Sequence, residues 1–222
     1  MGTNLIMRKL TLLGAIALLT SGAAVLAQDI ARAPAEAWVI GPIIRGKNYS
    51  VGMPLNPMPA QSGWSFEFPY PDLQAGHVHY ITLDTGPLVG KSKIVMRYRI
   101  DAARGTRFVP REHPHLPATM SLFFQRHGDS WSQKRHPQYR WWSPDATMPR
   151  LSPGMHEISV SLSDGRWIDV NGGLAKSNPA AFEDALRETA RIGLVFGSAS
   201  TRGHGVFSTA PARFTLMNYR VE

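Results

Sequence analysis

The stretch HEISVSLSD, residues 156–164, has the clearest strand pattern in the chain. Ile158, Val160 and Leu162 alternate with polar residues, so the apolar side chains share one face of an extended segment. A period of two residues with one polar face is typical of a strand whose sheet packs one side against a core. This stretch therefore predicts an antiparallel sheet with one solvated face.

The same alternation recurs in five further segments. They are residues 77–84, 93–101, 118–126, 191–198 and 213–221. In the segment 93–101, Arg97 and Arg99 lie on the face opposite to the apolar side chains. Turns that contain glycine or proline separate the segments, and six strands joined in this way predict two packed antiparallel sheets.

Residues 38–77 have a different pattern, because prolines interrupt every apolar run. Proline cannot donate to a strand ladder, so we expect short edge strands and long loops here. One helix is predicted near residues 179–190, where Asn178 can cap the first turn and Pro179 suits it. The predicted fold class is mostly β: an antiparallel two-sheet jelly-roll sandwich with one short helix near residues 179–190.

The first 27 residues predict an export signal. Arg8 and Lys9 precede an apolar run over residues 10–19, and residues 24–27 form a small-residue cleavage site. A membrane anchor fits less well, since spanning needs about 20 apolar residues. We expect a signal peptide over residues 1–27, a lead-in over 28–37 and a single β-sandwich domain over 38–222. The expected location is the bacterial periplasm or the medium, with no transmembrane segment after signal removal.

Charge and cysteine content narrow the classes of partner and chemistry. The chain has no cysteine, which excludes disulfides and thiol catalysis. Its 24 basic and 16 acidic residues give a formal net charge of +8. Such a balance favours contact with an acidic partner, such as a uronate-bearing polysaccharide or a lipid surface. Lysine and arginine are spread along the chain without a basic run, which argues against nucleic acid as a partner.

The C-terminal part carries a resemblance to a known group of folds. It is formed by three stretches, GMHEISVSLSDGRWIDVNG (154–172), AAFEDALRETARIGLVFGS (180–198) and FSTAPARFTLMNYRVE (207–222). This order of an alternating strand, a tryptophan, a short helix, a central strand and a closing strand resembles the C-terminal half of galactose-binding-like jelly rolls, which include carbohydrate-binding modules. The resemblance covers about residues 93–222 as a pattern of elements. It implies a jelly-roll sandwich and carbohydrate binding.

The stretch HPQYRWWSP, residues 136–144, is the richest in aromatic side chains. In a strand, Tyr139 and Trp141 share one face, and Arg140 and Trp142 share the other. Sugar rings bind aromatic faces, while arginine or glutamine beside the ring orients the hydroxyls. A large sandwich also uses tryptophan in its core, so one tryptophan can be core and its neighbour exposed. The predicted ligand-binding residues, taken as one groove on one sheet, are Arg97, Arg99, Phe123, Gln125, Tyr139, Arg140, Trp141 and Trp142.

His77 and His79 are two residues apart, so on a strand their imidazoles point together and can chelate zinc, copper or iron. The alternative is a pair of ordinary polar neighbours at a strand end, because no glutamate follows at the spacing that a cupin-type site uses. Elsewhere the chain has no HExxH motif. We expect no cofactor; structural calcium is compatible with this class of sandwich, but no acidic loop marks a site.

The loop sequence VFGSASTRGHGVFS, residues 195–208, places three glycines around Arg202 and His204. It is interpreted either as a plain turn whose glycines permit positive φ or as a loop that grips a ligand.

Catalytic motifs are weak in this chain. A glycosidase needs two facing carboxyl groups, and the acidic residues of the strands show no pairing in the sequence. No GxSxG elbow is present. We therefore expect an exported, non-catalytic binding protein for a glycan or another anionic cell-envelope ligand. The alternatives are a jelly-roll polysaccharide lyase-like enzyme, which needs a cation with a tyrosine or histidine, and a structural or assembly protein of the cell envelope.

Overall fold

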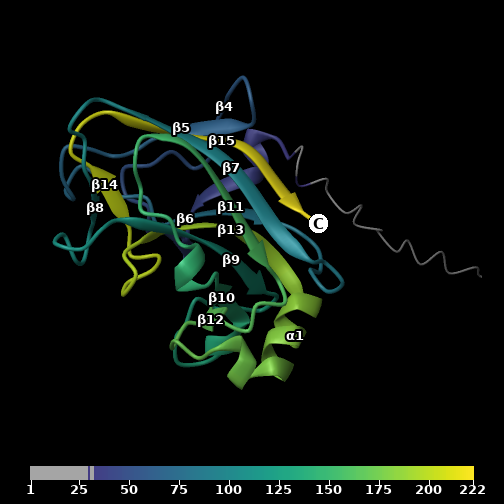
Figure 1. The fold of residues 1–222 in the computed structure, drawn as a ribbon. Helices are drawn as coiled ribbons and strands as arrows, with labels where there is room; N and C mark the ends of the chain where they lie inside the picture. Colours follow the sequence, from purple (N-terminus) through teal and green to yellow (C-terminus); the bar gives the residue numbers. More distant parts are fainter. Residues whose placement is uncertain (1–29, 31–32) are drawn as a thin grey trace, which may run out of the picture.

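The computed structural model of the protein describes residue 30 and residues 33–222. The predicted signal peptide and most of the lead-in lie outside these described residues. Two antiparallel sheets face one another across a shared core, and the single α-helix of the described residues lies at one end of the sandwich (Figure 1). The predicted class, a mostly β sandwich with one helix, is confirmed.

The larger sheet has six strands. Their order is β1 (Trp38–Gly41), β6 (Tyr80–Asp84), β13 (Thr189–Gly197), β9 (Thr119–Arg126), β10 (Arg140–Trp142) and β12 (Ile168–Asp169). The second sheet has the order β11 (Gly154–Ser161), β7 (Lys93–Ala102), β15 (Ala212–Val221), β5 (Trp64–Glu67) and β4 (Met58–Pro59). Two small ribbons pair β14 (Val206–Ser208) with β8 (Phe108–Pro110), and β2 (Ile43–Ile44) with β3 (Lys47–Asn48).

All six strands expected from the alternating pattern are present, as β6, β7, β9, β11, β13 and β15. In β11, Ile158 and Val160 are buried while Glu157, Ser159 and Ser161 are exposed, so this edge strand has one buried and one wet face. The proline-rich segment forms strands of two to four residues, as expected.

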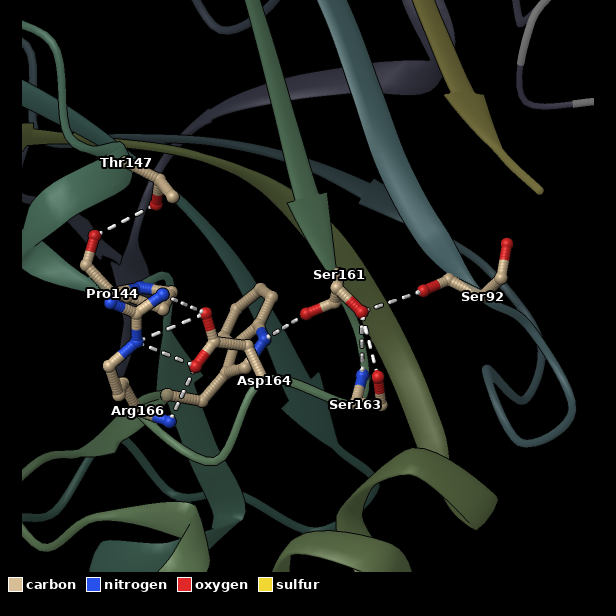
Figure 2. Close-up of polar contacts among 8 residues, drawn as sticks. Ser92, Pro144, Thr147, Ser161, Ser163, Asp164 and Arg166 are labelled. Carbon is tan, nitrogen blue, oxygen red and sulfur yellow. Dashed lines mark hydrogen bonds and ion pairs between the residues drawn. The ribbon is translucent and has the colours of Figure 1, made fainter.

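The turn after β11 is held by hydrogen bonds at Ser161 and by an ion pair between Asp164 and Arg166 (Figure 2). The Ser161 carbonyl accepts a hydrogen bond from the indole Nε1 of Trp167 at 2.8 Å, which fixes that ring in the core. Arg166 and Asp164 form an exposed pair in the same turn, with Nη2 and Oδ2 2.6 Å apart. A serine-rich turn thus anchors a large buried ring.

The helix α1 (Pro179–Arg187) is shorter than predicted. It ends at Arg187 because Thr189 already belongs to β13, and the Thr189 hydroxyl donates to the Ala185 carbonyl at 2.7 Å. Asn178 occupies the N-cap position but makes no side-chain capping bond, so that part of the prediction is wrong. Phe182 packs its ring edge-on to Trp141 at 5.0 Å between centroids, which attaches the helix to the core.

Candidate functional site

The outer face of the six-stranded sheet carries a groove of about 820 Å³. Tyr80 of β6 and Trp142 of β10 lie in it, and Trp131 lines it from the loop between β9 and β10. The loop of residues 199–204 lines it from the side of β13 and β14. The groove therefore has an aromatic floor on the sheet and walls made by two loops.

The floor is a small apolar cluster that is separate from the main core. Tyr80, Phe123, Trp142 and Val195 are each 8% exposed or less and pack together on this face. The Tyr80 ring lies edge-on to Phe123, with centroids 5.1 Å apart. Val195 pairs with Tyr80 across the strands, so the cluster spans neighbouring strands of the sheet. The outer face is thus partly covered rather than open.

Asp129 organises the loop above this cluster. Its side chain has no exposed surface, and its Oδ2 accepts hydrogen bonds from Arg140 Nε and Gln125 Nε2, both at 2.8 Å. Its Oδ1 accepts the backbone N–H of Trp131 at 3.0 Å. One carboxylate therefore ties two strands, β9 and β10, to the loop that carries Trp131.

Trp131 is the aromatic residue that this network presents to the groove. Its backbone has φ +61°, a left-handed conformation that is costly for a bulky residue. The Arg140 guanidinium lies 4.5 Å from its ring centroid, and the ring is edge-on to Tyr80 at 5.1 Å. The indole is half-buried. Its orientation is thus set by a cation on its face and by a buried carboxylate under its backbone.

The loop of residues 199–204 is held down by an arginine. Arg202 is buried, its Nη1 donates to the Ser143 carbonyl at 2.5 Å, and its Nη2 pairs with Asp145. Gly203 has φ +77°, and an added Cβ would run into the Tyr80 ring. The glycine is required because the loop approaches Tyr80 closely. This loop is therefore a packed wall of the groove, and its role in gripping a ligand stays a prediction.

His77 and His79 are buried, with ring centroids 4.7 Å apart. Burial, together with the neighbouring His77, lowers the pKa of His79 to about 3. Its Nδ1 contacts the Gly203 carbonyl at 2.7 Å, whereas its Nε2 has no hydrogen-bond partner. Among the residues that the structure describes, no group of three or more His, Asp or Glu side chains is placed to hold a metal ion. Within the described residues, His77 and His79 are thus not joined by a third acidic or histidine side chain placed to ligate a metal, and no acidic cluster is placed to hold calcium.

The structure brings together only some of the eight predicted ligand-binding residues. Arg140 and Trp142 line the groove, but both are buried, so the expectation that one of the two tryptophans is exposed is wrong. Phe123 and Gln125 lie beneath it, fully buried in the floor and in the Asp129 network. They support the groove rather than contact its interior.

The other predicted residues lie elsewhere. Trp141 faces the core between the sheets, with no exposed surface, because its neighbour Trp142 takes the outer side of β10. Tyr139 stacks on His136 outside the groove, with centroids 4.4 Å apart. Arg97 and Arg99 belong to β7 of the five-stranded sheet and are exposed. The single groove expected to include them is therefore wrong, because the two arginines lie on a different sheet.

Sequence reasoning missed the most important lining residues. Tyr80 follows the two histidines directly, and Trp131 lies in a loop, where the strand pattern gives no signal. Arg111 also lines the groove, from the end of β8. One sequence signal could have identified Trp131. It is a large aromatic residue in a polar loop, outside any alternating stretch that would place it in the core.

No protein-family model matches the chain, and no curated protein sequence does. None of the helices in the described residues has the length and apolar content needed to cross a bilayer.

Proposed function

We propose that this chain is a non-catalytic binding protein for a glycan that lies in the groove on the six-stranded sheet. The observation that carries the proposal is the half-buried Trp131 indole, which Arg140 and Asp129 hold rigidly at the groove. A saccharide ring has an apolar face of C–H groups, and a preorganised indole binds such a face at little entropic cost.

Polar side chains along the groove also support this proposal. Gln133, Asn171 and Ser200 line the groove and are exposed, so their amide and hydroxyl groups are accessible to a ligand. Amides and hydroxyls both donate and accept hydrogen bonds, as the hydroxyls of a sugar do. Hydroxyl-rich ligands match a site that combines aromatic rings with a few accessible polar groups.

Two titratable side chains that line the groove, His79 and Tyr80, are poorly suited to acid–base catalysis. A general base works best with a pKa near the working pH, whereas burial lowers the pKa of His79 to about 3 and raises the pKa of Tyr80. The two groove carboxylates are engaged: Glu112 contacts His204 at 2.7 Å, and Asp169 accepts two backbone N–H groups through Oδ1. These observations favour binding over a lyase or a glycosidase.

The cellular setting is part of the proposal and rests on the sequence. The export signal expected over residues 1–27 directs the chain to the bacterial periplasm or the medium, where its ligand is a cell-envelope or extracellular glycan. Mass spectrometry of the N-terminus of protein recovered from outside the cytoplasm checks the expected cleavage after Ala27.

The test is a titration of purified protein with a panel of oligosaccharides, followed by tryptophan fluorescence and calorimetry. Trp131→Ala should weaken binding at least about tenfold, the equivalent of about 1.4 kcal/mol. Trp142→Ala is the poorer test, because Trp142 is buried and its truncation costs about 3–5 kcal/mol of stability. Tyr70→Ala is the matched control, since Tyr70 is an exposed aromatic residue outside the groove.

Three results overturn the proposal. The first is that no member of the panel binds to folded protein. The second is that Trp131→Ala binds as well as the unchanged chain. The third is the release of unsaturated sugar products during incubation, which would make the protein a lyase.

A further inference from the structure

Charged side chains along the groove are mostly engaged by other protein groups. Arg140 is paired with Asp129, and Arg202 is paired with Asp145. Neither guanidinium is a free charge for a ligand, since its carboxylate partner already balances it.

Arg111 differs from these two arginines. It is exposed, it lines the groove, and among the described residues no carboxylate lies within ion-pair distance of it. The adjacent Glu112 side chain contacts His204 instead, with Oε1 2.7 Å from Nδ1. Arg111 is therefore a guanidinium at the groove without a direct carboxylate partner among the described residues.

The backbone fixes where this charge lies. Arg111 directly follows β8, and its N–H donates to the Gly205 carbonyl at 2.9 Å. Gly205 in turn packs against His79, since a Cβ added there would lie 2.7 Å from His79 Nε2. The charge of Arg111 also contributes to lowering the pKa of His77 and of His79, after burial. Arg111 thus stands at the His79 end of the groove, close to the start of β6.

The opposite end of the groove carries a negative charge. Asp169 lines it from β12, which is separated from β6 by β13, β9 and β10. Four strand spacings of about 4.8 Å place the two ends roughly 19 Å apart, which is long enough for an oligosaccharide. The groove therefore has a guanidinium without a carboxylate partner at one end, beside the Glu112 carboxylate that contacts His204, and the Asp169 carboxylate at the other end.

We propose that Arg111 binds the carboxylate of an acidic sugar residue, so that the glycan in the groove is a uronate-type oligosaccharide with its acid group at the β6 end. This inference rests on the proposed glycan-binding function. A guanidinium forms two parallel hydrogen bonds with a carboxylate, which supplies both orientation and affinity. Asp169 disfavours an acid group at the other end, because like charges repel there.

The experiment compares an oligouronate with its carboxyl-reduced neutral counterpart of the same length and linkage. Calorimetry is performed on the unchanged protein and on Arg111→Gln, with Arg107→Gln as the control. Arg107 is an exposed arginine just before β8 that does not line the groove, so its replacement removes the same net charge. Circular dichroism and urea unfolding verify that both variants fold.

We expect Arg111→Gln to bind the oligouronate at least about tenfold more weakly, and the neutral sugar as the unchanged protein does. Arg107→Gln should change neither affinity. The inference is overturned if Arg111→Gln binds the oligouronate with unchanged affinity, or if the unchanged protein binds both sugars equally. If equal binding still depends on Trp131, the proposed function survives. If neither sugar binds, this inference fails, whereas the proposed function fails only if no member of the oligosaccharide panel binds either.

Discussion

The stability of the protein in acid tests the buried state of His79. The Gly203 carbonyl can only accept a hydrogen bond, so His79 Nδ1, 2.7 Å away, carries the proton and Nε2 is bare. Burial and the neighbouring His77 lower the pKa of His79 from 6.5 to about 3. His79 is therefore neutral in the folded protein over a pH range in which it is protonated in the unfolded chain.

The sign and the size of the effect follow from linkage. Between pH 6.5 and about 3 the unfolded chain binds a proton at His79 that the folded protein does not bind, so the free energy of unfolding falls as pH falls. The slope is about 1.4 kcal/mol per pH unit, and at about pH 4.5 the loss is about 2.7 kcal/mol. This is a large part of a typical stability of about 5–15 kcal/mol.

The assay is urea unfolding at a series of pH values between about 7 and 4.5. His79→Gln keeps an amide donor for the Gly203 carbonyl but cannot titrate, so its stability should fall less steeply, by about 2.7 kcal/mol over this range. His115→Gln, which removes an exposed histidine, should follow the unchanged protein. If His79→Gln and the unchanged protein lose stability in parallel, the assignment of a buried neutral histidine is refuted.

Two further predictions concern the walls of the groove. Asp129→Ala should cost about 3–5 kcal/mol in urea unfolding, because it leaves the Arg140 guanidinium buried without its partner. The double variant with Arg140→Met should regain most of this stability but not glycan binding, and full recovery of binding would contradict the role of the pair. Gly203 and Gly90 both have φ near +80°, so an alanine at either position is strained by the backbone. Only at Gly203 would the added Cβ also meet the Tyr80 ring, which makes Gly90→Ala the matched control for Gly203→Ala. Gly90→Ala should cost about 1–2 kcal/mol and Gly203→Ala clearly more; equal losses in thermal unfolding would show that the loop does not pack on Tyr80.

The strands could be predicted because their pattern is local. In β11, the alternation of Ile158 and Val160 with polar residues is sufficient to define both the strand and its buried face. The end of α1 was harder to predict, since the helical pattern runs on past Arg187 while the chain already joins β13. Tertiary pairing of β13 with β9 and β6 overrides local helix preference there.

Only part of the candidate site could be predicted from the sequence. Alternation assigns a residue to one face of its strand, but it does not assign the strand to a sheet. Period-two alternation tells which side of a strand a residue takes, so Arg140 and Trp142 were correctly assigned to one face and Trp141 to the other. It does not tell which sheet a strand joins. Arg97 of β7 has the same outward pattern as residues of β9, yet β7 pairs with β15 and β11 in the other sheet.

An outward side chain is also not always an exposed one, and this explains the residues that were missed. Phe123 and Trp142 point away from the main core, but the loop that carries Trp131 covers them and makes a second small core. That loop depends on Asp129, whose burial cannot be seen in the sequence, since a carboxylate in a polar loop is normally solvated. The left-handed backbone of Trp131 costs about 1–2 kcal/mol. The bonds from Asp129 offset that cost, so the ring best placed to bind a ligand is held by a residue that alternation could not identify.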